Sequence, residues 1–428
     1  MVSAIPKVPA LAARLRRNRV GLMLGAAMVA IVAGECVLAW TTYGTADVLI
    51  FSTFAATVRD VGPIHIYGLA EAGLNTYNHP PLVGWWLVVV NGLTELGLPF
   101  SFVIRLPAIL AHAATVPLVF VVLRRRTSPR IALTSAMLVA ASPMLVILSG
   151  FHGNNDPVVA LFTILSVYLL VDRRAPVWAG AAFAVAISIK IVPVIALPLL
   201  LVAAARLEKG YLGRFVGGGL PVFGAIWARV LVQEGGGFVR HVLAYNGEGF
   251  PRVWGLYDIG DWTGVPSAAL HGYATIGAYV VLAVAAAVPA ILVWPAPRRA
   301  PAAVGLAFSL FLTLTPSWAP QYLAWIGATV FLIEFWSATA FTVGVGSIYT
   351  YLYAYWNGFR PWTVGNVGPP TAGQRPFLVL AWALTAATAV AGVLALRRRH
   401  RPRHACLEST VDPQPDMLPV ASSSSESR

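Results

Sequence analysis

The sequence predicts an all-α membrane protein, a polytopic transmembrane helical bundle of about twelve spans. Of its 428 residues, 58% are hydrophobic and only 11% are charged, whereas soluble domains carry about a quarter charged residues. Apolar runs that approach the ~20 residues needed to cross a bilayer recur along the chain, and short basic clusters separate them. These observations indicate an integral membrane protein.

The basic residues report the predicted orientation in the membrane. Lys and Arg outnumber Asp and Glu by 30 to 17, which gives a formal net charge of +13. With a cytoplasmic N-terminus, every basic cluster falls on the cytoplasmic side, as the positive-inside rule requires. The clusters lie at 14–19, 124–130, 173–174, 206–214, 298–299 and 397–403. The excess charge therefore indicates topology rather than a polyanionic partner, and we expect a multi-pass protein of the cell membrane with both termini cytoplasmic.

The apolar runs place the expected spans in order. They lie near 20–41, 102–123, 130–148, 157–171, 176–190, 192–206, 212–232, 271–294, 302–316, 320–336, 338–356 and 376–396. The first is long enough to be an uncleaved signal-anchor. We expect a cytoplasmic N-terminus over 1–19, a membrane-embedded domain over 20–400, and a Pro- and Ser-rich, disordered cytoplasmic tail over 401–428.

The long first extracytoplasmic loop, 42–101, holds two further apolar stretches. The stretch 84–98 is short and contains Asn91 and Glu95. Counting it as a span would reverse every later segment and place the arginine clusters outside. We therefore predict interfacial or re-entrant helices over 84–98 and 47–60.

Several motifs resemble those of a known superfamily of membrane enzymes. The motifs are an acid soon after the first span (Asp47), then Tyr77-Asn78-His79-Pro80-Pro81-Leu82, Arg105-Leu106-Pro107, Phe151-His152-Gly153-Asn154-Asn155-Asp156-Pro157, Ile187-Ser188-Ile189-Lys190-Ile191-Val192-Pro193 and 313–323, which reads TLTPSWAPQYL. Their order and spacing resemble the GT-C superfamily of membrane glycosyltransferases, in its bacterial polyprenol-phosphate-mannose-dependent branch. The resemblance runs from about residue 20 to 400.

Two features depart from the superfamily pattern. Many members carry a paired acidic motif in the first loop, whereas Thr45-Ala46-Asp47 supplies one acid. The large soluble C-terminal domain of the oligosaccharyltransferase branch is absent, which argues against glycan transfer to a protein sequon.

Asp47 is the predicted catalytic residue. A sugar on a lipid phosphate has a good leaving group, so an inverting transfer needs one general base rather than the pair of carboxylates found in glycosidases. Asp47 lies alone in an apolar loop, where partial desolvation should raise its pKa and suit it to that role. A solvated loop acid is the alternative, and Asp60 is the second choice for the base.

Other residues are candidates for binding. Leaving phosphate gathers negative charge, so cations should face it, and we expect Lys190, Arg240 and His241 to bind the donor phosphate. Lys190 also fits a lysine that snorkels to the interface. The candidates for substrate binding are Tyr77, His79, His152, Asp156, Gln321 and Tyr322. We expect no cofactor and no metal site, because no second ligand lies at a convincing spacing from Asp156.

The sequence therefore predicts a membrane hexosyltransferase that moves a hexose, with mannose the expected sugar, from a polyprenyl-phosphate donor to an extracytoplasmic lipid or glycan acceptor. No glycine-rich strand–helix motif is present to bind a nucleotide sugar. The alternative is a polytopic lipid or sugar transporter or flippase. Transporters tend to place polar groups near the midplane, whereas here the ionisable residues gather at one face, leaving mainly Glu35, His112, Arg229 and Glu334 in or near the spans.

Overall fold

The computed structural model describes residues 8–69, 76–244, 254–317, 319–359, 364–365, 371 and 373–398. Residues up to Leu396 form one compact unit. The predicted tail, 401–428, and the first seven residues lie outside the described part of the chain. The described part is almost entirely helical, as predicted.

The α-helices are α1 (Val8–Thr41), α2 (Ala46–His65), α3 (Pro81–Glu95), α4 (Phe100–Val103), α5 (Leu106–Leu123), α6 (Pro129–Ala140), α7 (Pro143–Val146), α8 (Asp156–Val171), α9 (Pro176–Ile189), α10 (Leu197–Leu207), α11 (Tyr211–Phe238), α12 (Gly255–Trp262), α13 (Ser267–Ala274), α14 (Ile276–Val293), α15 (Ala300–Leu314), α16 (Ala324–Gly327), α17 (Phe335–Trp356) and α18 (Arg375–Arg397). Short 3-10 or π segments join several of them: η1 (Ile66–Gly68), η2 (Ile147–His152), η3 (Val192–Ala196), η4 (Val239–Leu243), η5 (Pro297–Arg299), η6 (Pro320–Leu323) and η7 (Thr329–Leu332).

Six helical stretches are long and apolar enough to cross a membrane: Asn18–Thr41, Phe100–Leu123, Pro129–His152, Tyr211–Leu243, Ile276–Val293 and Arg375–Arg397. Shorter apolar helices cover Asp156–Val171, Pro176–Ile189 and Val192–Leu207. One expected span differs in form. Residues 320–336 are not a continuous helix, because η6, α16 and η7 break them into three single turns.

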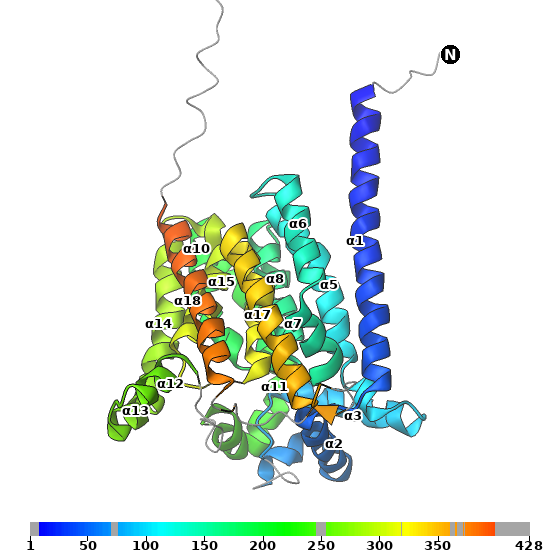
Figure 1. The fold of residues 1–428 in the computed structure, drawn as a ribbon, viewed down its shortest axis with the longest axis vertical. Helices are drawn as coiled ribbons and strands as arrows, with labels where there is room; N and C mark the ends of the chain where they lie inside the picture. Colours follow the sequence, from blue (N-terminus) through cyan, green and yellow to red (C-terminus); the bar gives the residue numbers. More distant parts are fainter. Residues whose placement is uncertain are drawn as a thin grey trace, which may run out of the picture. The chain divides into compact units, whose positions relative to one another are not determined.

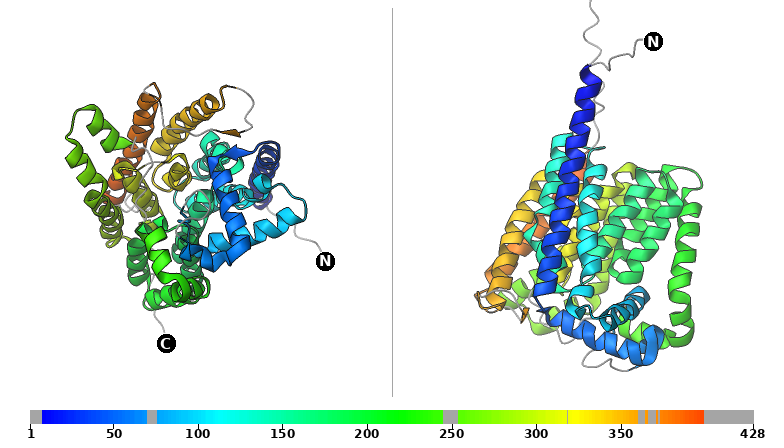
Figure 2. Two further views of the ribbon diagram at one scale, coloured as in Figure 1. Left: turned by 90° about the horizontal axis from the view of Figure 1, so that it is seen from below. Right: turned by 90° about the vertical axis from the view of Figure 1, so that its right-hand side faces the viewer.

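Helices α2 and α3 lie across one end of the bundle, where the sequence predicted interfacial helices (Figures 1 and 2). They begin at Ala46 and Pro81, and a nearby residue favours the start of each helix. Thr45 caps α2, and Pro81 occupies the first turn of α3, where its missing N–H costs nothing. The start of α1 and the outermost turns of α5 and α6 lie at the opposite end (Figure 1).

The two strands form only a short clasp. β1 (Gly44–Thr45) pairs in parallel with β2 (Val364–Gly365). The pairing ties the backbone just before α2 to the segment that follows α17.

Glycines allow helices α9 and α11 to approach closely, which the Gly217–Gly219 run predicted. A Cβ on Gly218 would lie 2.1 Å from the carbonyl oxygen of Val177, and one on Gly180 would lie 1.9 Å from that of Phe215. Gly217 faces open space, so Gly218 and Gly180 make the contact.

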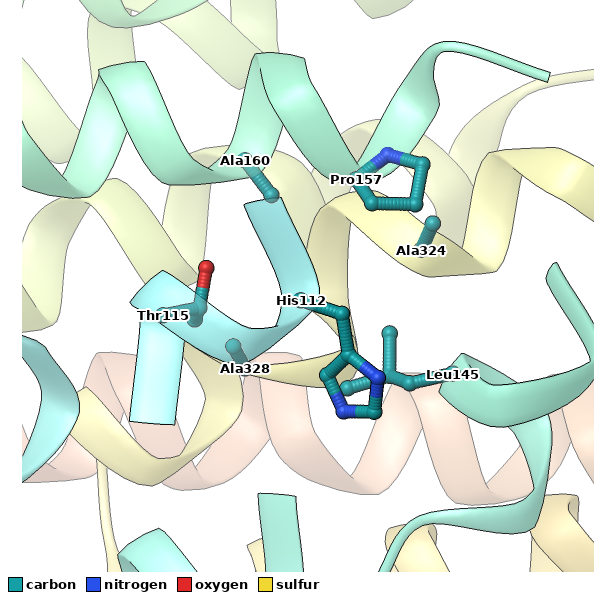
Figure 3. A pocket seen from close by; sticks show the side chains of 7 residues that line it. All are labelled: His112, Thr115, Leu145, Pro157, Ala160, Ala324 and Ala328. Carbon is teal, nitrogen blue, oxygen red and sulfur yellow. The ribbon is translucent and has the colours of Figure 1, made fainter. Parts of the chain in front are cut away.

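A buried polar pair joins α1 to α5. His112 Nδ1 lies 2.6 Å from Glu35 Oε1, and His112 Nε2 lies 2.9 Å from the carbonyl oxygen of Val139 on α6. His112 therefore bonds neighbouring helices, as the sequence suggested. A small void adjoins its ring, lined by His112, Thr115, Leu145, Pro157, Ala160, Ala324 and Ala328 (Figure 3).

Candidate active site

The chain just before α2 is shaped to hold Asp47 in place. The Thr45 hydroxyl accepts a hydrogen bond from the Asp47 N–H at 3.3 Å and donates one to the carbonyl oxygen of His152 at 2.7 Å. Gly44 has φ +102, and a Cβ there would lie 2.7 Å from the carbonyl oxygen of Phe151. The start of α2 is thus fitted closely to the segment that carries His152.

Arg105 connects the same two segments through hydrogen bonds. Its guanidinium is fully buried and donates to the carbonyl oxygens of Thr42, Tyr43 and Gly150 and to the Thr42 hydroxyl, at 2.5–3.0 Å. Its partners lie at the end of α1 and in the π segment η2. Backbone carbonyls are the natural acceptors for a buried guanidinium that has no carboxylate beside it.

The two carboxylate oxygens of Asp47 have different surroundings. His152 Nε2 lies 3.2 Å from Oδ2, Asn154 Nδ2 lies 2.8 Å from it and Gln321 Nε2 lies 3.5 Å from it. Within the described part of the chain no hydrogen bond reaches Oδ1. The side chain is 25% exposed, so Asp47 is held through one oxygen and keeps the other for a ligand.

His152 comes from a distorted stretch of backbone. The π segment η2 ends at His152, and Gly153 follows with φ +91. A Cβ on Gly153 would lie 2.4 Å from Val48 Cγ2. Only glycine therefore fits between His152 and α2, and the turn it makes directs both His152 and Asn154 toward Asp47.

Lys190 and Asp156 form a second charged pair in the same region. The ammonium nitrogen of Lys190 lies 2.8 Å from Asp156 Oδ1, and the Trp325 indole also donates to this oxygen. Asp156 Oδ2 is buried without a partner. Lys190 lies over the rings of Tyr322 and Trp325, 5.1 and 5.2 Å from their centroids, and its side chain is 20% exposed. The cation is held rigidly but still reaches solvent.

The pKa of Asp47 is lowered, which corrects the expectation of a raised one. Burial alone would raise it, but the opposing effects prevail: the charge of His152, the hydrogen bonds from His152 and Asn154, and the charge of Lys190. The sequence showed the apolar surroundings of Asp47 but not these partners, which lie more than 100 residues away. Asp47 is therefore ionised at neutral pH.

His79 and Tyr77 belong to an aromatic cluster beside the charged groups. His79 stacks on Phe51 with ring centroids 4.9 Å apart, and Tyr77 is buried against Phe54 and Tyr67. Burial lowers the pKa of His79 to about 3, with a further contribution from the charge of Lys190. His79 is consequently a neutral ring at the edge of the site, and Tyr77 lies in its wall.

The structure brings together most of the predicted site residues. Contacts join Asp47 to His152 and Gln321, and a second set joins Lys190 to Asp156 and Tyr322. The two sets lie close enough for the charge of Lys190 to act on Asp47. Arg240 and His241 lie in η4 at the end of α11, and no contact between described residues joins them to this group.

Three further residues escaped the sequence prediction. Asn154 and Trp325 touch the two carboxylates directly, and Tyr353 contacts the far side of His152. Asn154 lay inside a quoted motif, so its type and position were available signals. Tyr353 lies on α17, 201 residues beyond His152, and no local pattern marks it.

Within the described residues, no three His, Cys, Asp or Glu side chains are grouped so that they could hold a metal ion. The orphaned Oδ2 of Asp156 and the free Oδ1 of Asp47 are oxygens of the kind that bind hard cations. Lys190 and Asn154 donate hydrogen bonds to the other oxygen of each carboxylate. The described part of the site thus offers a carboxylate, Asp47, and an ammonium, Lys190.

Comparisons with known proteins find a family model and solved structures that resemble parts of this chain. Residues 78–216, about a third of the chain, match the family model of dolichyl-phosphate-mannose-protein mannosyltransferases. The matched stretch includes His152, Asp156 and Lys190. A search of curated proteins finds no match.

Two solved structures are similar in fold. The apo Archaeoglobus fulgidus oligosaccharyltransferase is 12% identical with a TM-score of 0.42, over 86% of this chain and 56% of that one. The same enzyme tethered to an acceptor peptide containing the NVT sequon is 14% identical with a TM-score of 0.38, over 86% and 55%. This chain thus spans just over half the length of those structures.

Over residues 78–216, this helical membrane bundle is thus similar to the dolichyl-phosphate-mannose-protein mannosyltransferases.

Proposed function

We propose that the chain transfers a hexose, mannose, from a polyprenyl-phosphate carrier to an extracytoplasmic lipid or glycan acceptor, with inversion at the anomeric carbon. The observation that carries this proposal is the pairing of an ionised Asp47, with one free oxygen, and a fixed Lys190 in one cluster. The description of the matched family, dolichyl-phosphate-mannose-protein mannosyltransferase, supports the donor class and the sugar.

Each charge has a part in the proposed reaction. Asp47 Oδ1 accepts the proton of the acceptor hydroxyl as its oxygen forms a bond to the anomeric carbon. The bond from that carbon to the phosphate oxygen breaks, and polyprenyl phosphate leaves with the electron pair. Lys190 faces the charge that develops on the phosphate and stabilises it where water is partly excluded.

A lowered pKa makes Asp47 a weaker base than a free carboxylate but keeps it charged. A strong base is not required, because the phosphate is a good leaving group and proton transfer completes only as the new bond forms. The arrangement positions the base, because three donors hold Oδ2 and leave Oδ1 for the hydroxyl of the acceptor substrate.

The donor class is tested by supplying purified protein with acceptor lipids extracted from the source cells. One reaction receives a polyprenyl-phosphate hexose and another receives the matching nucleotide sugar without any lipid carrier. We expect transfer only in the first. A parallel reaction with a denatured protein extract in place of the lipids separates a lipid or glycan acceptor from a protein one. Transfer from the nucleotide sugar alone would disprove the proposed donor.

A further inference from the structure

A buried tryptophan lies beside the ion pair of Asp156 and Lys190. Trp325 lies in α16, is 1% exposed and stacks on Tyr322, with ring centroids 4.7 Å apart and an interplanar angle of 17°. Phe308 of α15 also packs against it, with ring centroids 6.4 Å apart. The indole ring is therefore held in one orientation by its neighbours.

One oxygen of Asp156 accepts two hydrogen bonds, from Lys190 and from Trp325. The Lys190 ammonium nitrogen lies 2.8 Å from Oδ1, and the Trp325 indole N–H donates to the same atom. Asp156 is fully buried, and its Oδ2 has no hydrogen-bond partner among the described residues. The torsion that turns a carboxylate is soft, so a single donor would leave the group free to rotate. A second donor from a rigid ring restricts that rotation and keeps the oxygen that holds Lys190 in place.

The rest of the ammonium group faces aromatic rings and solvent. Lys190 Nζ lies 5.1 Å from the ring centroid of Tyr322 and 5.2 Å from that of Trp325, and the side chain is 20% exposed. A ring face attracts a cation but accepts no hydrogen bond as strong as that of a carboxylate oxygen. An ammonium has three N–H donors, and Asp156 is the acceptor that the described residues supply to Lys190. N–H groups therefore remain for the oxygens of an anionic ligand.

We propose that Trp325 is a positioning residue for Lys190. The indole N–H fixes the Asp156 carboxylate, the ring face seats the ammonium, and the remaining N–H groups meet the phosphate of the lipid carrier. This inference rests on the proposed role of Lys190 in donor binding. Without the indole N–H, Asp156 turns more freely and Lys190 follows it, so the cation occupies the productive position for a smaller share of the time.

Trp325→Phe tests the hydrogen bond, because phenylalanine keeps an aromatic ring and removes the indole N–H. We expect kcat/KM for a polyprenyl-phosphate hexose to fall by about 3- to 10-fold, less than on replacement of Lys190 itself, since the cation is still present. The KM for the acceptor should change little. Trp325→Leu also removes the ring face and should cause a larger loss. Trp382→Phe is the matched control, because the Trp382 indole donates to the backbone carbonyl of Thr313 at 2.8 Å, and losing this bond should leave donor use unchanged.

A double-variant cycle separates positioning from packing. In an Asp156→Leu background no carboxylate remains for the indole to hold, so Trp325→Phe should no longer change kcat/KM for the donor. A loss of the same size in both backgrounds, or an equal loss in donor and acceptor use, would show that Trp325 acts only through packing and would overturn the proposal.

A second measurement depends neither on catalysis nor on the Asp156→Leu variant. In protein labelled with ¹⁵N-tryptophan, the signal that is missing from Trp325→Phe belongs to the Trp325 indole N–H. Asp156→Asn should move this signal, because the acceptor loses its charge. Added polyprenyl phosphate should also move it in the unaltered protein but not in Lys190→Gln.

These spectra distinguish a failure of the inference from a failure of the proposed function. A signal that stays in place in Asp156→Asn would overturn the positioning role, whatever donor the enzyme uses. A signal that responds to Asp156→Asn but not to polyprenyl phosphate, together with normal donor use by Lys190→Gln, would overturn the role of Lys190 in donor binding and the positioning role with it.

Discussion

Asp47 differs from an ordinary loop carboxylate in the asymmetry of its two oxygens. Three side-chain nitrogens converge on Oδ2, while no hydrogen bond between described residues reaches Oδ1, and the side chain is 25% exposed. A solvated loop acid would have no such partners, and the catalytic role of Asp47 stays a proposal.

Replacing Asp47 with Asn should abolish most turnover. The amide keeps the shape but cannot accept a proton from the acceptor, and we expect kcat to fall by ~10²–10⁴-fold with donor binding largely retained. Purified-enzyme assays measure the rate, and donor titration measures binding. Asp60→Asn is the control, since Asp60 lies exposed on the same helix. A near-normal rate in Asp47→Asn together with a loss in Asp60→Asn would show that Asp60, rather than Asp47, is the general base.

The activity should persist to an unusually low pH. The folded protein lowers the pKa of Asp47, so the ionised base is fully present above the ordinary carboxyl range and is lost only as pH falls through the lowered value. A kcat/KM profile at constant ionic strength checks this. An acidic limb that stays unchanged in Asp47→Glu would show that another group titrates.

Lys190 carries the charge proposed to face the donor phosphate. Lys190→Gln should lower kcat/KM for the donor by about 10- to 100-fold, since a hydrogen bond to a charged group contributes roughly 1.5–3 kcal/mol. The KM for the acceptor should change little. Lys209→Gln, at an exposed position, is the control for overall charge.

Lys190→Gln also leaves Asp156 buried without its cation, which destabilises the fold. The double variant Asp156→Asn/Lys190→Gln removes both charges and should unfold at a temperature closer to that of the unaltered protein. Equal losses in donor and acceptor use by this double variant would point to a structural role for Lys190, in keeping with a lysine placed only by the interface.

At the residue scale, the sequence identified most of the site and missed its internal connections. His152, Asp156, Lys190 and Gln321 were each marked by a short motif. The direction of the Asp47 pKa shift was wrong, because it depends on which of these residues meet. Those pairings span 105 to 274 positions, and only the fold determines them.

At the scale of elements, the site lies where helices end early. Helix α9 has 14 residues and rises about 21 Å at 1.5 Å per residue, less than the ~30 Å of bilayer hydrocarbon. It stops at Lys190, which has extended backbone angles, and Pro193 follows in η3. Helix α8 begins at Asp156 beside it. Two short, packed helices therefore meet at the charged pair.

The sequence foresaw this break from Pro193 and Pro198 but not the one at residues 320–336. Their composition is that of a span, and no proline interrupts 321–336. Tertiary contacts explain why this stretch is not a continuous helix. The Trp325 indole donates a hydrogen bond to Asp156, and the Gln321 amide donates one to Asp47. The hydropathy of a segment indicates that it avoids water. It does not tell whether lipid or protein surrounds the segment.

Gly153 offers a test of the segment that carries His152. Gly153→Ala adds a Cβ at φ +91 that would lie 2.4 Å from Val48 Cγ2. The left-handed backbone alone costs on the order of 1–2 kcal/mol, and the contact must also displace α2 or His152. We expect a lower unfolding temperature and a marked loss of kcat.

Gly97→Ala is the matched control for the backbone cost. Gly97 has φ +94 but open space around its Cβ position, so this variant should lose stability without losing turnover per folded molecule. Val48→Ala in the Gly153→Ala background shortens the opposing side chain and should restore part of the rate. No recovery would indicate that the backbone angle, rather than the contact, positions His152.

At the scale of the whole molecule, the charged cluster and the basic connections lie at opposite ends of the bundle. The sequence of helices from α1 to α9 places the α5–α6 and α8–α9 connections at the end where α1 begins, away from α2 and α3 (Figure 1). These connections hold Arg124 to Arg130 and Arg173 to Arg174, which the positive-inside rule assigns to the cytoplasm. That assignment predicts a site on the extracytoplasmic side, where the proposed lipid-linked sugar donor is available and cytoplasmic nucleotide sugars are not.

The expectation of about twelve spans stays a prediction. The sequence holds twelve apolar runs, and six stretches of the described residues are long and apolar enough to cross a membrane by themselves. Several of the remaining helices are buried against other helices. Such protein contacts allow the interior of the bundle to hold polar pairs such as Glu35 with His112.

The proposed orientation predicts which positions can be reached from each side. In a variant without its native cysteines, a single cysteine at position 78, in the first loop, should react with a membrane-impermeant maleimide in intact cells. One at position 128, between α5 and α6, should react only after the membrane is permeabilised. Ser128 caps α6 beside the Arg124–Arg130 cluster, so its exposure reports the side on which the arginines lie. Labelling at 128 from outside would reverse the orientation and place Asp47 and Lys190 on the cytoplasmic side, where a nucleotide sugar would become the reasonable donor.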